Sequence, residues 1–357
     1  MLAPSIFVAF TVTLVFMVSL RPFAFGVGLV DKPGGRKAHV GDVPLVGGIA
    51  MFFGLMAGLA LVPVDSSLHT YFPLATGFLV IIGVLDDRFH APTALRFVTQ
   101  LTAVLLMVYG AGLVLHDMGD PFGTGIVHTG PMALIFTVLV VVATINAFNV
   151  VDGIDGLAAC LALVSLLAVA YVSSVGGVDY SLPLIACGAI FGFLLFNFPN
   201  TRNRRVRSFM GDAGSTMLGM VVVWATLGIA QGKTQLASPV ICLWFASVPI
   251  YDLFTSFVRR IRKGKSPFQP GREHFHHTLM RGGFGVRQTL GILTGLQMVY
   301  AAIGLLGLYS GVPDWVMFLS WSIAGITQHK VLVFISARHR LLSRRRRSKT
   351  LSVIEVR

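Results

Sequence analysis

The chain has 357 residues, of which 55% are hydrophobic and only 12% are charged, and its formal net charge is +13. A soluble domain carries about 25% charged residues, so the composition excludes an ordinary soluble protein and favours a membrane protein. The positive charge lies in short segments beside apolar stretches, where anionic lipid headgroups are the nearest partner. The charge therefore does not indicate nucleic-acid binding.

Eleven apolar stretches are candidates to cross a bilayer as helices, which takes about 20 residues each. The first lacks a preceding basic region and a small-residue cleavage site, so we expect a retained span and not a signal peptide. The sequence predicts an all-α integral membrane protein, with one polytopic domain over residues 1–336 and a basic tail over 337–357. The expected spans are 4–20, 45–62, 72–85, 95–114, 131–147, 157–175, 182–198, 213–230, 239–256, 289–309 and 314–336.

The connections between these stretches alternate between a nearly uncharged set and a basic set. Apart from Lys233, Lys330 and Arg96, every Lys and Arg falls in the basic set or the tail. Because short cytoplasmic loops are enriched in Lys and Arg, we expect the basic set in the cytoplasm. An odd number of spans then places the N-terminus in the periplasm of an inner membrane and the C-terminus in the cytoplasm. We expect the basic tail to face anionic membrane lipids.

The acidic residues are few, and five of them gather at the expected cytoplasmic edges of three apolar segments. Ionisable groups at membrane depth are costly and usually indicate function. Carboxylates brought together repel one another, and a divalent cation with oxygen ligands is the simplest counter-charge. These residues are Asp86, Asp87, Asp152, Asp155 and Asp212.

Two of these acids, Asp86 and Asp87, close the third apolar stretch. The helix dipole disfavours negative charge at a helix C-terminus, so their position needs a reason. A solvated helix end is the simplest alternative to a functional pair.

A second polar motif follows the fifth stretch and repeats every third residue. An α-helix turns by about 100° per residue, so this spacing drifts away from a single helical face. Gly153 and Gly156 permit a break, and irregular backbone at this depth is tolerated where it lines a cavity. We therefore expect a turn that brings Asp155 back toward the others, although capping of the next helix explains part of its position. The repeated residues are Asn146, Asn149, Asp152 and Asp155.

A third motif, Phe209-Met-Gly-Asp-Ala-Gly-Ser215, opens the eighth stretch. The free N–H groups and the dipole of a helix start suit a phosphate or a metal-bound oxygen near Asp212. A simple helix cap is the alternative for this residue.

A fourth motif, Arg272-Glu-His-Phe-His-His277, lies in the longest basic loop. Three histidines in four residues could bind zinc. The neighbouring His276 and His277 cannot easily share one tetrahedral ion, however, and the arginines around them favour contacts to an anion. Histidine also offers acid–base chemistry near neutral pH.

Together these motifs resemble the polyprenyl-phosphate N-acetylhexosamine-1-phosphate transferase family. The similarity runs in order from about residue 26 to 300, and only Phe275 departs from the pattern, where a smaller aliphatic residue is typical of the family. The segments that carry the resemblance are Asp31-Lys-Pro33, Pro44-Leu-Val-Gly-Gly48, Asp86-Asp-Arg-Phe89, Asn146-Ala-Phe-Asn-Val-Val-Asp-Gly-Ile-Asp-Gly156, Phe209-Met-Gly-Asp-Ala-Gly-Ser215 and His274-Phe-His-His277.

The resemblance implies an eleven-span bundle whose active site faces the cytoplasm, and it permits a homodimer. It implies a Mg²⁺-dependent reaction, with Mn²⁺ as a substitute, in which UDP-N-acetylglucosamine and undecaprenyl phosphate give the lipid-linked diphosphate sugar and UMP. This would be the first membrane step of O-antigen or related surface glycan synthesis.

The family's site residues carry over by position. Asn149 and Asp212 match metal-binding residues, and Phe209 matches an aromatic side chain against the uracil, with Asp155 nearby. Arg96 matches a basic residue near the phosphates. Asp86 and Asp87 match the paired acids near the lipid phosphate, with Asp152 as a further catalytic acid. Arg272, His274, His276 and His277 match the segment that contacts the sugar diphosphate, with His276 in a catalytic role.

The sequence leaves several alternatives open. The second pKa of a phosphate monoester is about 6, so the lipid phosphate hardly needs a general base, and the sequence does not tell which of Asp86 and Asp87 acts on it. Another UDP-N-acetylhexosamine, or UDP-N-acetylmuramoyl-pentapeptide, could be the donor. A transporter would also hold intramembrane acids, but near the bilayer midplane and not at one edge.

Overall fold

The computed structural model of the protein describes residues 2–32, 41–63, 65–199, 207–264, 266 and 274–354, and the side chains of the last helix as far as Leu341. A short antiparallel pair, β1 (Val30–Asp31) and β2 (Val43–Pro44), places Val30 opposite Pro44. The helices are α1 (Leu2–Val27), α2 (Gly47–Leu59), α3 (Ser66–Phe89), α4 (Thr93–Ala111), η1 (Gly130–Met132), α5 (Ala133–Val151), α6 (Leu157–Val175), α7 (Ser181–Asn197), α8 (Gly211–Gln231), α9 (Pro239–Phe245), α10 (Ser247–Arg262), α11 (Phe275–Arg281), α12 (Val286–Tyr309) and α13 (Asp314–Ile354).

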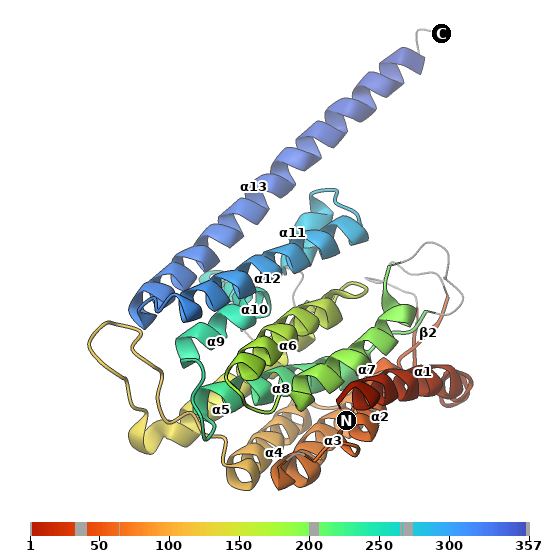
Figure 1. The fold of residues 1–357 in the computed structure, drawn as a ribbon. Helices are drawn as coiled ribbons and strands as arrows, with labels where there is room; N and C mark the ends of the chain where they lie inside the picture. The colour runs from red at the N-terminus through yellow and green to blue at the C-terminus, as the bar shows by residue number, and fades with distance from the viewer. Residues whose placement is uncertain are drawn as a thin grey trace.

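This arrangement confirms the all-α class and a multi-pass architecture. Among the described residues, eight helices are long and apolar enough to cross a membrane, or nine if the bent pair α9–α10 counts as one span. The shorter apolar helices α2 and α7 coincide with the expected spans 45–62 and 182–198. The expected start of the basic tail at residue 337 falls inside α13, which continues to Ile354 and extends beyond the bundle (Figure 1).

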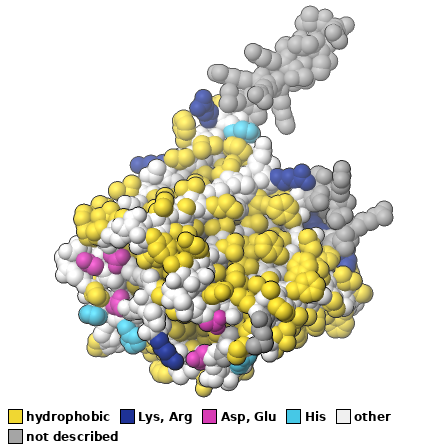
Figure 2. Space-filling view, in the orientation of Figure 1, with side chains coloured by type: hydrophobic (Ala, Val, Ile, Leu, Met, Phe, Trp, Pro, Cys, Tyr) yellow, Lys and Arg dark blue, Asp and Glu magenta, His cyan; other side chains and the backbone are white. Residues whose placement is uncertain are grey.

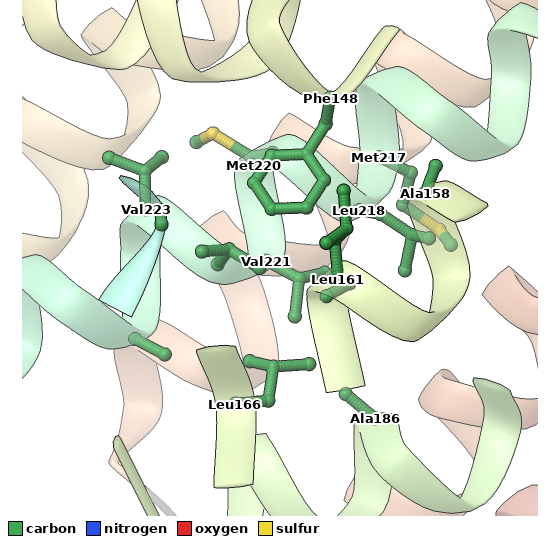
Figure 3. Packing of buried hydrophobic residues seen from close by; sticks show 14 of the residues in the cluster. Phe148, Ala158, Leu161, Leu166, Ala186, Met217, Leu218, Met220, Val221 and Val223 are labelled. Atoms are coloured by element: carbon green, nitrogen blue, oxygen red, sulfur yellow. The ribbon is translucent and has the colours of Figure 1, made fainter. Parts of the chain in front are cut away.

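Helix α8 lies at the centre of the bundle, since 89% of its most apolar 18-residue stretch is buried. It packs against α2, α3, α5, α6 and α7. Figure 3 shows Met217, Leu218 and Val221 of α8 facing Phe148 of α5 and Leu161 of α6. In Figure 2 the visible outer face is largely hydrophobic, with charged side chains mainly toward its margins, as a helical bundle in lipid requires.

Two glycines allow neighbouring helices to approach the start of α8 very closely. A Cβ on Gly48 of α2 would lie 2.3 Å from the backbone nitrogen of Gly214. A Cβ on Gly83 of α3 would lie 2.3 Å from the Cα of Ala213. Real Cβ atoms do not make such contacts with backbone, so these positions require glycine. This packing presses α2 and α3 against the first turn of α8, where Asp212 lies.

We expect Gly83→Ala to destabilise the protein by about 1–3 kcal/mol, the usual cost of overpacking. Gly77→Ala is the matched control in the same helix, because its Cβ would approach nothing closer than the Phe52 ring at 3.6 Å and alanine is the better helix former. Thermal unfolding in detergent should show a lower midpoint for Gly83→Ala alone. Equal midpoints for both variants would contradict this packing.

The expected span 239–256 is a broken one, because the chain bends by 90° between α9 and α10. The bend leaves backbone groups without intrahelical partners, and the buried amide of Gln297 in α12 satisfies them. Its Oε1 accepts from the Val248 N–H at 2.9 Å, and its Nε2 donates to the Phe245 carbonyl at 2.7 Å. Pro249, in the first turn of α10, is the local signal for a break in the helix. The side chain that stabilises the bend comes from another helix.

Candidate active site

Those predicted site residues that the structure describes lie together where one set of helix ends meets. The C-termini of α3 and α5 and the N-termini of α4, α6, α8 and α11 supply them. This convergence follows from the alternation of short connections, which returns every second helix end to the same side of the bundle. The motifs are far apart in the sequence and are brought into contact only by this topology.

The centre of the site is a cluster of acids around one arginine. The Arg96 guanidinium donates to Asp86 Oδ2 at 2.9 Å and lies 3.7 Å from Asp212 Oδ2. The Asp86 side chain is only 9% exposed, whereas that of Asp212 is 37% exposed. Asp212 is therefore the carboxylate that a ligand from the aqueous side can reach, and Arg96 fixes the buried one.

Asp87 supports the start of α8. Its Oδ1 accepts a hydrogen bond from the Asp212 N–H at 3.0 Å. Its Oδ2 is buried and has no hydrogen-bond donor among the described residues. Gly211, with φ +68°, leaves no room for a side chain here, since a Cβ would lie 2.2 Å from that Oδ2. One carboxyl oxygen of Asp87, next to Asp212, therefore lacks a hydrogen-bond donor within the described residues.

Asn149 links this cluster to α5. Its Nδ2 donates to Asp212 Oδ1 and to Ser215 Oγ, both at 2.9 Å. The assignment of an amide nitrogen and oxygen follows from the hydrogen-bond network, and a half-turn of this amide would present Oδ1 to the same space. Asn146 instead donates to Gln100 Oε1 at 2.8 Å. It therefore joins α5 to α4 and takes no part in the cluster.

The expected break after α5 is present. The helix ends at Val151, and a turn through Gly156, with φ +76°, leads into α6. Asn197 accepts from the Gly156 N–H at 2.7 Å and donates to the Ser208 carbonyl at 2.8 Å. This amide ties the turn to the segment that precedes α8.

The turn holds Asp152 near the other acids. Burial raises the pKa of Asp152 to about 8, and the negative charges of Asp212 and Asp155 add to the shift. A bound cation would oppose this repulsion. The turn thus places Asp152 within electrostatic range of both Asp212 and Asp155.

Asp155 lies on the other side of the turn and pairs with Arg207. The Arg207 guanidinium also lies over the Phe209 ring, 4.9 Å from its centroid. One face of this ring is therefore occupied by a cation that Asp155 holds in place. Phe209 and Asp155 are close, as expected, and Arg207 is the intervening residue that sequence reasoning missed.

The histidines lie at the start of α11, and His276 lies against the turn. A Cβ on Gly153 would lie 2.2 Å from His276 Nε2, so glycine is what lets this imidazole approach the backbone. The rings of His276 and His277 lie 4.2 Å apart, and His274 and His276 are stacked at 5.9 Å. Arg272, predicted to act with them, lies outside the described residues.

His276 is held neutral by its surroundings. Burial lowers its pKa to about 3, with the charges of His277 and His274 contributing. A neutral imidazole still offers one N–H donor and one acceptor. The structure therefore places an uncharged hydrogen-bonding group, and not a cation, against the Asp152 turn.

This pKa gives a prediction for the pH dependence of stability. In the unfolded chain, His276 binds a proton below its ordinary pKa of 6.5. In the folded protein, the same imidazole is protonated only near pH 3. The free energy of unfolding should therefore fall by about 1.4 kcal/mol per pH unit as the pH drops through this window. His276→Gln should lack this contribution, so thermal midpoints from pH 7 to 5 should fall less steeply. Parallel pH profiles for the two proteins would show that His276 titrates normally.

The acidic cluster offers oxygen atoms that could hold a divalent cation. Among the described residues, no three His, Cys, Asp or Glu side chains enclose a metal ion by themselves. Magnesium does not need such an enclosure, because it usually takes one or two carboxylates plus substrate phosphates and water. The accessible Asp212 carboxylate and the orphaned oxygen of Asp87 are oxygen donors of the required kind, and Asn149 would add its amide oxygen after a half-turn of the amide.

Comparison with known proteins defines the class to which this site belongs. The chain belongs to glycosyl transferase family 4, whose model matches residues 69–230. That segment runs from α3 through α8 and contains the acidic cluster and the Asp152 turn. The resemblance seen in the motifs is thus confirmed.

Several curated relatives are similar over most of the chain, and all three named here are undecaprenyl-phosphate alpha-N-acetylglucosaminyl 1-phosphate transferases. The relative from Salmonella typhi is 38% identical over 352 residues, which cover 95% of each chain. That from Escherichia coli K12 is 38% identical over 88% of this chain and 86% of its own. That from Haemophilus influenzae is 38% identical over 89% and 90%.

Proposed function

We propose that the protein transfers N-acetylglucosamine 1-phosphate from UDP-N-acetylglucosamine to undecaprenyl phosphate and releases UMP. The observation that carries the proposal is the similarity to transferases with these substrates over up to 95% of the chain. The convergence of every described motif at one end of an apolar bundle supports it. The product would enter O-antigen or related surface glycan synthesis as a lipid-linked sugar diphosphate.

The proposed setting is the bacterial inner membrane, with eleven crossings, the N-terminus in the periplasm and the active site facing the cytoplasm. The eight long apolar helices, the bent pair and the two shorter apolar helices would together make these crossings. The concentration of Lys and Arg in the connections on the site's side supports the orientation. Anionic lipids would accompany the basic segment after residue 337.

Phosphoryl transfer depends mainly on positioning and charge neutralisation, and the site offers both. Asn149 and Asp212 would hold Mg²⁺, or Mn²⁺ in its place, which when bound supplies positive charge to the diphosphate. Arg96 adds a fixed guanidinium between Asp86 and Asp212. Because the lipid phosphate is largely dianionic at neutral pH, the paired acids would chiefly orient it, or accept its last proton.

The donor would lie across the Asp152 turn. Phe209 would stack on the uracil in the place that the Arg207 guanidinium now takes, with Asp155 nearby. His276 and His277 would donate N–H groups to the sugar diphosphate, while His274 lies behind them. The attacking lipid oxygen and the leaving UMP would then be on opposite sides of the β-phosphorus.

The test is release of UMP by purified protein, with and without polyprenyl phosphate, across a panel of UDP-sugars. The proposal expects release only when polyprenyl phosphate is present, and fastest with UDP-N-acetylglucosamine. Preference for another UDP-N-acetylhexosamine would mean that the proposed donor is wrong and that the proposed class of reaction is right. Uptake of a nucleotide sugar into vesicles without UMP release would support a transporter instead.

A further inference from the structure

Asp252 is a buried carboxylate that none of the site motifs includes. It lies in α10 and is only 1% exposed. Among the described residues, His274 lies against it, with Nδ1 3.3 Å from Asp252 Oδ2, and neither of these two atoms makes a hydrogen bond. Burying a charged group is expensive unless it is paired and hydrogen-bonded, so this carboxylate needs a role that offsets its cost.

The two oxygens of Asp252 contact the first two residues of the histidine segment. Oδ1 accepts a hydrogen bond from the Phe275 N–H at 2.8 Å, while Oδ2 faces the His274 ring. His274, the residue that precedes α11, makes no side-chain capping bond within the described part of the chain. The cap that a helix start usually takes from its own sequence is thus supplied by another helix.

The contacts continue from Asp252 into the proposed active site. The same short helix that Asp252 caps carries His276, which lies against Gly153 in the turn that holds Asp152. His274 stacks on His276. A shift at the start of α11 would therefore displace the imidazole nearest to the acids. The 90° bend before α10, stabilised by Gln297, sets the direction of the helix that bears Asp252.

We propose that Asp252 is a positioning residue, which fixes the ring of His274 and the first turn of α11 so that His276 and His277 face the substrate. The inference rests on the proposed phospho-sugar transfer for its kinetic consequences only. A buried carboxylate held 3.3 Å from one ring nitrogen restricts the orientation of the imidazole by packing and by charge. For histidines that bind metals, loss of a supporting carboxylate costs about 10–100-fold, and we take that range as the expected scale here.

The kinetic test compares Asp252→Asn and Asp252→Ala with Ser256→Ala. Ser256 lies one turn further along the same helix, is equally buried, and its hydroxyl makes no hydrogen bond within the described residues. We expect about a 10-fold loss of kcat for Asp252→Asn, which keeps an acceptor for Phe275, and about 100-fold for Asp252→Ala. Ser256→Ala should keep wild-type turnover. Wild-type kcat in Asp252→Ala would overturn the proposal.

A double-mutant comparison separates positioning from a general loss of stability. If Asp252 acts through His274, adding Asp252→Asn to His274→Gln should cause little further loss of kcat. Fully additive losses would overturn the proposed route through His274. If Asp252→Ala does not give monodisperse protein, Asp252→Asn carries the same comparison.

Amide hydrogen exchange tests the proposal without any assumption about the reaction. The amides of Phe275–Arg281 should exchange faster in Asp252→Ala than in the wild type or Ser256→Ala, while those of the central helix α8 stay protected. Unchanged exchange in α11 would overturn the positioning role even if the enzyme is active. If α11 exchanges faster in Asp252→Ala but the wild-type protein transfers no sugar phosphate, the proposed function is wrong and the structural role of Asp252 still stands.

Discussion

Asp212→Asn is expected to reduce turnover by about 1,000-fold while the protein stays folded. Asp212 is the exposed carboxylate of the cluster and is hydrogen-bonded to Asn149, so it is the group best placed to hold a divalent cation. Charge neutralisation by a metal is worth several kcal/mol in the transition state, and about 4 kcal/mol corresponds to 1,000-fold. Turnover should be measured against Mg²⁺ concentration in monodisperse protein.

The matched control for this change is Asp179→Asn. Asp179 is exposed and accepts from the Ser181 N–H at the start of α7, at the opposite end of that helix from the site. The amide oxygen of asparagine can accept the same hydrogen bond, so this variant should keep full activity. If Asp212→Asn turned over at the wild-type rate at ordinary Mg²⁺ concentrations, Asp212 would not be a metal ligand.

Alanine at His277 is expected to lower kcat/KM for the nucleotide sugar by about 10–100-fold. A hydrogen bond to a charged acceptor is worth about 1.5–3 kcal/mol, and His277 is the less buried member of the adjacent histidine pair. Alanine at His276 should cost at least as much, because that ring is buried against Gly153. The exposed His69, far from the site in the first turn of α3, is the control and should tolerate alanine.

The same variants decide between the anion and zinc interpretations of the histidine motif. In the structure, His274 Nδ1 faces Asp252, and His276 Nε2 faces the Gly153 backbone. The anion interpretation expects full activity after zinc is removed by a selective chelator. About one zinc per chain in active, chelator-washed protein, lost together with these histidines, would establish the zinc interpretation instead.

Local features of the sequence were enough to predict most of the helices. The apolar run 157–175 matches α6 at both ends, and the glycines after α5 correctly predicted a turn. Such features depend on hydropathy and on backbone freedom, which are properties of a short window. The acids of the site could also be assigned to one site from the sequence, because charged residues beside apolar stretches are rare and easily recognised.

Features created by contacts between distant segments could not be predicted in this way. The bend after α9 depends on Gln297, and the position of Arg207 over Phe209 depends on Asp155. Asp252 did leave a signal, because it is an acid inside the expected span 239–256, and ionisable residues in spans usually indicate function. Unlike the other acids of the site, Asp252 does not lie beside a charged or polar motif at the edge of an apolar stretch, so the motifs alone do not include it.

The most direct measurement uses UDP-N-acetylglucosamine labelled with ³²P at its β-phosphate, incubated with the purified protein, Mg²⁺ and undecaprenyl phosphate. Transfer of the sugar together with its phosphate moves the label into the lipid phase and leaves unlabelled UMP in the water. Transfer of the sugar alone leaves the label in UDP. The account predicts lipid-bound ³²P in amounts equal to the UMP released, and water-soluble [³²P]UDP as the labelled product would contradict it.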